Sequence, residues 1–293
     1  MIRKTEAFLH VAAVLSFVFL ASCHRVSSES GPDLVAPASV AGIERMHSIN
    51  AQLTTGSSPD SDGYRALQAL GVDVVVSVDG PPPPVDLIDS LGMRSIHLPV
   101  GYGEIPSHVM RSLVRLSDEA AESHLYVHCH KGRHRGPAVA AILLTVRDGG
   151  STDQAISVLS ACGTSPEYAG LWASVEKPDI PEGACSDAAL PALVEPDSLI
   201  RQMDLIQEVR DRLDDTASIK DARANLLLLK EAFIELERLH VPAWSVERPN
   251  WNSDIGATID LVESLRVAPV FDAGALGLID ARCDSCHAAS RHR

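Results

Sequence analysis

The chain has 293 residues, with 39 Asp and Glu against 25 Lys and Arg and a formal net charge of −14 at pH 7. This length exceeds the usual size of a single domain, so we expect two domains with tails. The acidic balance excludes general nucleic-acid binding, which requires a basic surface.

Residues 1–22 predict a signal peptide. Arg3 and Lys4 precede an apolar run over residues 8–20, which is too short for a membrane span. The run closes on a Leu-Ala-Ser-Cys sequence ending at Cys23, which resembles the lipobox of bacterial lipoproteins. The resemblance implies lipidation of Cys23 and a place in the bacterial periplasm or at the cell surface, anchored to the membrane by lipid. An ordinary cleaved signal and an uncleaved anchor are the alternatives.

The next segments predict a tether followed by an α/β domain. Residues 23–40 are rich in Ser, Pro and Ala, as expected of a tether. Residues 41–175 then alternate between helix-like and strand-like stretches. The expected helices cover residues 64–70, 85–91 and 107–123, and the expected strands cover residues 72–78, 95–100 and 125–127. This alternation predicts a central sheet flanked by helices.

The remainder of the chain has a different pattern. Residues 176–197 contain four prolines and predict a linker. From residue 198 the apolar residues follow a helical period, and the expected helices cover residues 198–213, 220–240, 255–267 and 273–289. We therefore expect the α/β domain to be followed by an all-α four-helix bundle over residues 198–293.

The residues from His128 to Gly136 form the densest basic cluster of this acidic chain. Within it, Cys129 lies six residues before Arg135, after a strand-like run and ahead of an apolar helix with Pro137 near its first turn. A loop in this position directs backbone N–H groups and the positive end of a helix at one point. Such a point binds anions and favours a thiolate.

This loop resembles the signature of cysteine-dependent phosphatases, which is His-Cys, five residues and Arg, and residues 41–175 follow the layout of dual-specificity phosphatases. The resemblance implies that Cys129 attacks phosphorus to form a phosphocysteine and that Arg135 grips two phosphate oxygens. It also implies that His128 supports the thiolate. The phosphate cradle would be formed by the amides of His130, Lys131, Gly132, Arg133, His134 and Arg135.

Two positions depart from the family pattern. Gly136 stands where these phosphatases carry Ser or Thr, whose hydroxyl helps the thiolate leave, so the resemblance implies slow hydrolysis of the intermediate. The general acid is usually an Asp in the loop after the strand at residues 95–100. Glu104 is the only carboxylate in that loop, and it either protonates the leaving oxygen or is a solvated residue. Asp79 is a second candidate for the acid, although a turn role beside Gly80 suits it better.

A second motif lies near the C-terminal end. Cys283, Cys286 and His287 match the attachment motif of a c-type haem, in which two thioethers hold the haem and the histidine ligates iron. A zinc or redox cysteine pair is the alternative. Because the motif lies in the last expected helix, residues 198–293 resemble class II cytochromes c. That resemblance implies one covalent haem c, an electron-transfer partner or a small gas ligand, and a homodimer.

The same resemblance predicts which residue faces the open side of the haem. Arg201 and Gln202 resemble a residue pair in the first helix of these cytochromes, and this register places Leu205 over the iron. Met203 lies two residues from Leu205, and residues two apart point about 200° apart around a helix, so Met203 is expected to be a packing residue. Met203 is the alternative sixth ligand. His240 is a further candidate ligand.

The chain has six cysteines, and an exported protein allows them to pair. If one is lipidated, one is a nucleophile and two hold haem, then Cys162 and Cys185 remain. They either form a disulfide or are two free thiols.

These patterns predict an exported, lipid-anchored phosphatase that hydrolyses phosphomonoesters through a phosphocysteine intermediate and is fused to a c-type haem domain. The alternative is an electron-transfer or gas-binding cytochrome whose phosphatase-like domain binds anions without turnover. A lipid-anchored interaction protein with two inactive sites is the third hypothesis.

Overall fold

The computed structural model describes residues 40–181, 183, 185–194, 199–216, 218–239, 251–270 and 273–288. The predicted signal peptide, Cys23, most of the tether and His240 lie outside the described residues. Among the described residues, no helix combines the length and the apolar character that a membrane crossing requires. Residues 40–194 form an α/β part and residues 199–288 form a helical part, and both belong to one compact unit.

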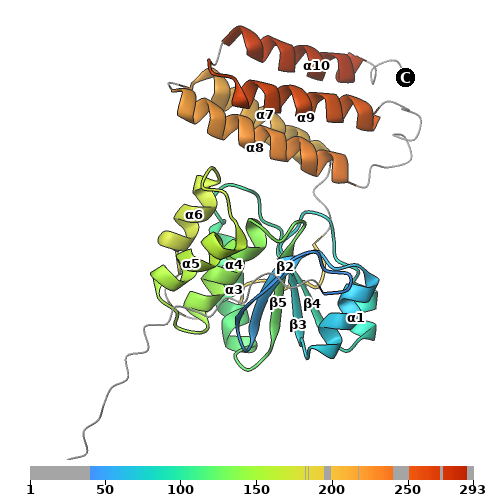
Figure 1. Cartoon of the computed structure of the whole chain (residues 1–293), viewed down its shortest axis with the longest axis vertical. Coiled ribbons are helices and arrows are strands. Elements are labelled where there is room, and N and C mark those ends of the chain that lie inside the picture. Colours follow the sequence, from blue (N-terminus) through green and yellow to red (C-terminus); the bar gives the residue numbers. More distant parts are fainter. Residues whose placement is uncertain are drawn as a thin grey trace, which may run out of the picture. The chain divides into compact units, whose positions relative to one another are not determined.

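A five-stranded mixed sheet forms the centre of the α/β part (Figure 1). Its strands, in spatial order, are β1 (Met46–Asn50), β2 (Leu53–Ser57), β5 (Leu125–Cys129), β3 (Val74–Ser77) and β4 (Arg94–His97). β1 runs antiparallel to β2, and the other neighbouring strands are parallel. The middle strand β5 is buried throughout and ends at Cys129, so the sheet places this thiol at its carboxyl edge.

Helices cover both faces of this sheet. They are α1 (Ser61–Ala69), α2 (Val85–Ser90), α3 (Ser107–Glu119), α4 (Arg135–Val146), α5 (Thr152–Cys162) and α6 (Ala169–Glu176). Successive side chains of a strand point to opposite faces. Val75 and Tyr126 therefore pack in a cluster with α1 and α2, whereas Val76 and Val127 pack in the larger cluster with α3 to α6.

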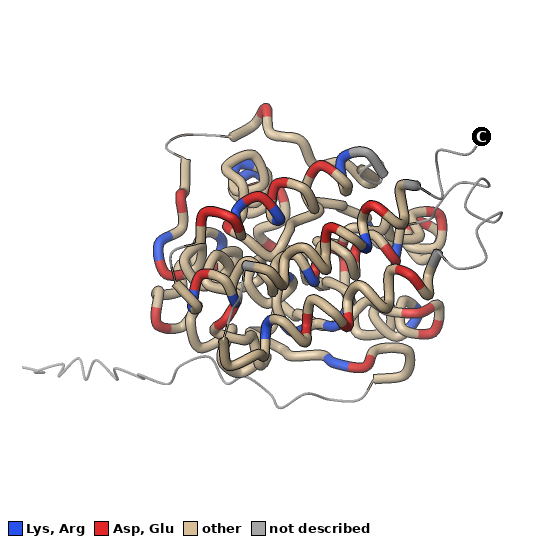
Figure 2. The backbone as a smooth tube through the Cα atoms, turned by 90° about the horizontal axis from the view of Figure 1, so that it is seen from above, with Lys and Arg blue, Asp and Glu red and all other residues tan. Residues whose placement is uncertain are grey.

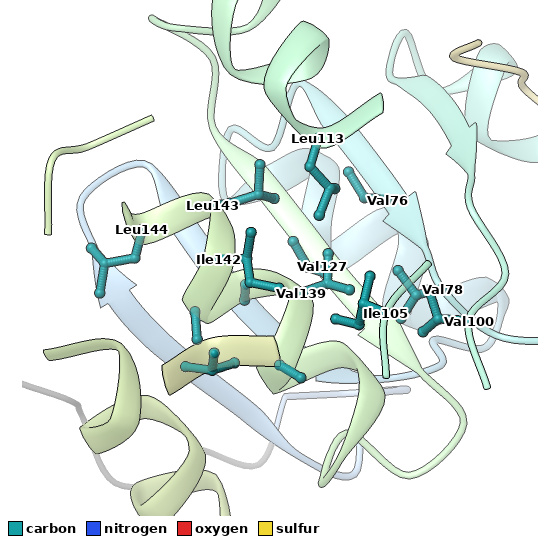
Figure 3. Packing of buried hydrophobic residues seen from close by; sticks show 14 of the residues in the cluster. Val76, Val78, Val100, Ile105, Leu113, Val127, Val139, Ile142, Leu143 and Leu144 are labelled. Carbon is teal, nitrogen blue, oxygen red and sulfur yellow. The ribbon is translucent and has the colours of Figure 1, made fainter. Parts of the chain in front are cut away.

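Helix α4 is buried from Arg135 to Leu144, which explains its uniformly apolar sequence after the first turn. Figure 3 shows Val139, Ile142 and Leu143 of α4 beside Val127 of the middle strand. Because α4 begins directly after the loop that follows β5, this packing fixes the position of its first residue, Arg135.

The predicted linker is not a free segment where the structure describes it. His97 of β4 donates its backbone N–H to Pro191 O over 2.8 Å, and Val194 N donates to His97 Nδ1 over 3.1 Å. Ser112 Oγ of α3 donates to Ala189 O over 2.6 Å. β4 is the edge strand, and this segment supplies partners for backbone and side-chain groups that would otherwise face water.

The helical part contains the four helices that the sequence predicts. They are α7 (Leu199–Asp214), α8 (Ile219–Arg238), α9 (Trp251–Val267) and α10 (Leu276–Ala288), with a 3-10 turn, η2 (Ala273–Ala275), before the last. α7 packs on α8, α8 on α9, and α9 on α10. They share an apolar cluster that includes Ile206, Leu229, Phe233, Val262 and Ile279.

Acidic and basic residues are interspersed along the backbone (Figure 2). Several of them form ion pairs in the helical part. Arg210 Nη1 and Asp214 Oδ2 lie 2.7 Å apart on α7, and Lys230 Nζ of α8 lies 3.1 Å from Glu263 Oε2 of α9. Pairs of this kind neutralise charge locally and contribute about 0 to 1 kcal/mol each where they are exposed.

Of the two alternatives for Cys162 and Cys185, a disulfide or two free thiols, the structure has two free thiols. Cys162 ends α5 and packs in the core of the α/β part. Cys185 lies in the segment beside α3, where its neighbour Asp187 pairs with Arg111. Burial, together with the nearby Cys129, raises the pKa of Cys162 to about 12, which keeps this thiol protonated.

Replacing Leu143 of α4 tests the packing of the core. Leu143 is fully buried, and Leu143→Ala is expected to lower the free energy of unfolding by about 2 to 5 kcal/mol because a cavity remains. Leu70→Ala, at a position that is 51% exposed, is the matched control and is expected to change it by less than about 0.5 kcal/mol. Urea unfolding followed by circular dichroism measures both, and equal losses would contradict the packing described.

Candidate active site

The loop from Cys129 to Arg135, here called the 129–135 loop, joins the end of β5 to the start of α4. His134 is the residue that precedes α4, and its side chain makes no capping hydrogen bond to the helix. The first N–H groups of α4 therefore point into the loop without a side-chain cap. A helix N-terminus in this state attracts an anion.

The shape of the loop is fixed by its contact with the end of β2. Gly132 has φ +65°, and a Cβ there would lie 2.4 Å from both Gly56 C and Ser57 N. Ser58 N also donates to His130 O over 3.1 Å. Only glycine combines this conformation with so close a backbone approach, which explains its place in the loop.

Arg135 is the most unusual side chain of the site, because it is only 1% exposed and still carries a charge. Nη2 donates to Asp79 Oδ1 over 2.9 Å and to Glu235 Oε1 over 2.8 Å. The guanidinium carbon lies 4.4 Å from the ring centroid of Tyr102. Burial alone would lower the pKa of Arg135, but the neighbouring groups, Tyr102 and Glu235 first among them, raise it.

The Nε atom of Arg135 is buried and has no hydrogen-bond partner among the described residues. A buried N–H without a partner is costly, and in a site of this kind it indicates a place for an oxygen ligand. The guanidinium presents Nε and Nη2 along one edge, which matches two oxygens of a phosphate or carboxylate. The geometry of the 129–135 loop therefore fits a bound oxyanion.

Asp79, the second candidate for the general acid, is held as a carboxylate. Besides Arg135, it accepts from Arg238 Nη2 over 2.6 Å and from Arg238 Nη1 over 2.9 Å. Burial alone would raise the pKa of Asp79, but the hydrogen bond from Arg238 and the charge of Arg135 lower it below its usual value. Asp79 Oδ1 also accepts from Gly80 N over 3.0 Å, which agrees with the turn role. These contacts suit an anchor for Arg135 and not a proton donor.

Glu104 lies at the rim of the same site. Its exposed side chain lines a cavity of about 440 Å³ that Arg135 and Tyr102 also line. The loop that carries Glu104 is held by α6, where Ser174 Oγ accepts from Ile105 N over 2.9 Å. The structure thus brings Glu104 and Arg135 to one cavity.

His128 is buried and neutral. Burial lowers its pKa to about 4, although nearby Asp79 opposes this shift, and neither ring nitrogen has a hydrogen-bond partner among the described residues. The ring stacks on Tyr126 with 5.9 Å between centroids. The prediction that His128 supports the Cys129 thiolate therefore involves an uncharged imidazole directly before the thiol.

The cationic side chains of the loop do not all face the same point. Lys131 and Arg133 are exposed, and His130 lines a separate cleft with Lys131. The His134 ring lies 4.4 Å from the Tyr168 ring, between centroids, and burial with the nearby arginines lowers the His134 pKa to about 4. The cradle expected from residues 130–135 therefore relies on backbone amides and on Arg135.

Gly136 is packed closely against β5. A Cβ at this position would lie 3.1 Å from Cys129 N and 3.4 Å from Thr55 Oγ1, so a serine there requires its neighbours to shift by a few tenths of an ångström. The hydroxyl of Thr55 donates to Val127 O over 2.8 Å. The close packing gives a structural reason for glycine at position 136.

The second predicted site lies in the helical part. Cys283 and Cys286 are half-buried on α10, and they line a cavity of about 210 Å³ together with His287, Met203 and Phe233. The donor set of two thiols, an imidazole and a thioether, around a cavity lined by apolar and polar residues, fits a c-type haem. Among the described residues, no group of three or more His, Cys, Asp or Glu is arranged to hold a metal ion by itself.

The expected register on α7 is not observed. Leu205 is 42% exposed and lines the 440 Å³ cavity beside Arg135, whereas Met203 lines the cavity of the cysteine pair. Gln202 is buried, and its Nε2 donates to Ala232 O over 2.7 Å. This contact with α8 accompanies a rotation of α7 in which Met203, and not Leu205, lines the cavity of the cysteine pair.

Several residues at the site were not predicted from the sequence. Three of them lie on α8, at 63 to 159 positions from the residues that they contact, and they are Glu231, Glu235 and Arg238. Acidic and basic residues on one face of a helix are typical of a face exposed to solvent. No local signal in the sequence therefore marks these three residues as part of a site. Tyr102 and Tyr168, which surround Arg135 and His134, were likewise missed.

Solved structures resemble this chain over about half of its length. TpbA from P. aeruginosa has 22% identity and a TM-score of 0.42, covering 50% of this chain and 91% of that chain. TpbA with a cysteine-to-serine substitution, in complex with pTyr, has 20% identity and a TM-score of 0.43, covering 52% and 94%. The core catalytic domain of a PP-IP phosphatase from S. cerevisiae has 15% identity and a TM-score of 0.39, covering 51% and 90%. No family model and no curated protein matches the sequence.

The depressed pKa of His128 predicts a loss of stability in acid. The unfolded chain binds this proton near the ordinary value of 6.5, whereas the folded protein binds it only near 4, so protons favour unfolding between these values. The free energy of unfolding is expected to fall by about 2 kcal/mol between about pH 7 and about pH 5 from His128 alone.

Urea unfolding over this pH range measures the effect, with His128→Gln as the comparison. The free energy of unfolding of the variant should decline less steeply as pH falls, because about one proton fewer is bound on unfolding. This holds even if the variant is less stable at every pH. His134 contributes in the same direction and remains in both proteins. Parallel pH curves for the two proteins would show that His128 is not the buried neutral group described.

Proposed function

We propose that this protein is a cysteine-dependent phosphatase that cleaves phosphomonoesters through a phosphocysteine intermediate. The observation that supports this most strongly is the buried Nε of Arg135, an N–H without a partner beside the nucleophile position and the start of α4. Cys129 at the end of β5, the glycine turn at Gly132 and the uncapped N-terminus of α4 complete an arrangement suited to a phosphate group.

In the first step of the proposed mechanism, the Cys129 thiolate attacks phosphorus. The S–P bond forms as the bond from phosphorus to the ester oxygen breaks, and the leaving oxygen takes a proton from Glu104. Arg135 and the loop amides bind the equatorial oxygens, where charge is stabilised in the transition state. Water then attacks phosphorus, giving inorganic phosphate and regenerating the thiolate, with Glu104 accepting the proton. Gly136 offers no hydroxyl to the departing thiolate, so this second step is expected to be the slower one.

The proposal includes export and a lipid anchor at Cys23, supported by the apolar N-terminal run and its Leu-Ala-Ser-Cys end. An extracytoplasmic place is also where c-type haem is attached, so the two motifs are mutually consistent. The substrate is then a phosphomonoester outside the cytoplasm.

A second function is favoured by the cavity of the helical part. We propose that Cys283 and Cys286 would hold one covalent haem c and that His287 would ligate its iron, with Met203 of α7 lining the same cavity. When bound, the haem supplies an iron that carries an electron or binds a small gas. In this alternative the 129–135 loop binds anions without turnover.

Turnover of p-nitrophenyl phosphate by the full chain under reductant tests the first function. Cys129→Ser is expected to lower kcat by at least about a thousand-fold while inorganic phosphate still binds, because only the nucleophile is lost. Arg135→Lys is expected to lower kcat/KM by about a hundred-fold or more, since lysine lacks the planar pair of donors. Arg65→Lys, at an exposed position on α1 outside the 129–135 loop, is the control and should retain activity. Activity that survives in Cys129→Ser would refute the mechanism.

Expression with a c-type haem maturation system tests the second function. The full chain is expected to keep its haem through denaturing electrophoresis, and Cys283→Ala with Cys286→Ala to lose it, because only thioether bonds survive denaturation. Cys185→Ala is the control for the loss of a thiol. A protein that binds zinc, or that gains no haem mass, would support the metal or redox pair instead. Met203→Ala should alter the optical spectrum of the loaded protein if Met203 reaches the iron.

A further inference from the structure

Three side chains on one face of α8 contact the 129–135 loop and its surroundings. Glu231, Glu235 and Arg238 are spaced four and three residues apart, so they line the same side of the helix. Glu231 Oε1 accepts from Tyr168 OH over 2.7 Å, and Glu235 Oε1 accepts from Arg135 Nη2 over 2.8 Å. Leu227, one turn earlier, packs in the main apolar cluster of the α/β part.

Arg238 and Glu235 together enclose the carboxylate that holds Arg135. Arg238 donates to both oxygens of Asp79, and its Nη1 also donates to Glu235 Oε1 over 3.0 Å. Two guanidinium groups and two carboxylates thus alternate in one network, which is buried at Arg135 and Asp79 and partly exposed at Glu235 and Arg238. Such a network is stable only while every charge has its partner, because an uncompensated buried charge is strongly unfavourable.

This network leaves Arg135 too few free N–H groups to grip a phosphate with two nitrogens. A guanidinium has five N–H groups, two of them on Nη2. Both Nη2 hydrogens are used, one by Asp79 and one by Glu235, whereas Nε has no partner. A phosphate gripped along the edge that carries the unpartnered Nε needs Nε and one hydrogen of Nη2 together. Asp79 or Glu235 must release Nη2 before that grip can form.

Glu235 is the partner that can leave. Asp79 belongs to the α/β part, two residues after the end of β3, and its contacts with Arg135 and Gly80 involve no residue of α8. Glu235 reaches Arg135 only because α8 lies against the loop, and a Cβ on Gly80 would lie 2.8 Å from Glu235 Oε2. Its carboxylate presents an anionic oxygen to the arginine in the manner of a phosphate oxygen.

We propose that Glu235 is a built-in competitor for the phosphate site, so that α8 holds the enzyme in an inhibited state until Glu235 leaves Arg135. The proposal rests on the proposed phosphatase function, because it concerns the same arginine. Glu231 with Tyr168, and Arg238 with Asp79, hold α8 in the inhibited position. In the inhibited state the Glu235 carboxylate already occupies Arg135, and the substrate phosphate binds by displacing that carboxylate.

The binding of inorganic phosphate to the full chain, measured by calorimetry, tests this independently of turnover. Glu235→Ala is expected to bind phosphate about tenfold or more tightly than the wild type, because a competing hydrogen bond between charged groups is removed. Glu235→Gln, which keeps the shape but not the charge, should give a smaller increase. Glu237→Ala is the matched control, since Glu237 is exposed on the same helix and should leave phosphate affinity unchanged.

The kinetic counterpart is p-nitrophenyl phosphate hydrolysis by the same variants. If Glu235→Ala raises kcat/KM by about the same factor as it raises phosphate affinity, the inhibited state is supported. Tighter phosphate binding with no turnover in any variant would leave the competitor role intact and refute the phosphatase function. Phosphate affinity that is unchanged or weaker in both Glu235→Ala and Glu235→Gln, with normal circular dichroism spectra, would overturn the proposal.

Discussion

A single buried cation, the guanidinium of Arg135, determines how the site is built. A charge at 1% exposure is tolerated only when nearby groups neutralise it and satisfy its N–H donors. Asp79, Glu235 and the ring of Tyr102 provide this, and the carbonyl of Val100 lies 3.4 Å from Nη1. The remaining donor, Nε, shows where an external oxygen belongs. The charge balance around this arginine therefore links the sheet, the loop after β4 and helix α8.

The sheet makes this arrangement possible. β5 lies between β2 and β3, so the residues that follow the three strands meet at one edge. Asp79 follows β3, Cys129 ends β5, and the end of β2 supports Gly132. The apolar packing of α4 against β5 then holds Arg135 at the start of a helix. Hydrophobic burial thus determines where a charged group can be placed.

Much of the fold and of the candidate site was predictable from local patterns in the sequence. The valine-rich run of β3 and the loop between Cys129 and Arg135 are strong signals, because burial and loop chemistry are encoded within a few residues. β1 and β2 were missed, since β2 is wholly buried yet reads Leu-Thr-Thr-Gly-Ser, with little apolar character. The roles of Leu205 and Met203 depended on the rotation of α7, which accompanies a contact of the buried Gln202 amide with α8. The contact of Glu235 with Arg135 joins distant parts of the chain, and no local pattern encodes it.

Helix α8 takes part in two sites, because Phe233 and Leu236 line the cavity of the cysteine pair while Glu235 reaches Arg135. If Glu235 must withdraw for phosphate to bind, then phosphate and a ligand of the cavity act on the same helix. Thermodynamic linkage requires any influence between them to be reciprocal: whatever factor an occupant of the cavity applies to phosphate affinity, phosphate applies to the affinity for that occupant. The affinity of the cavity for its occupant would then depend on the phosphate concentration around the protein.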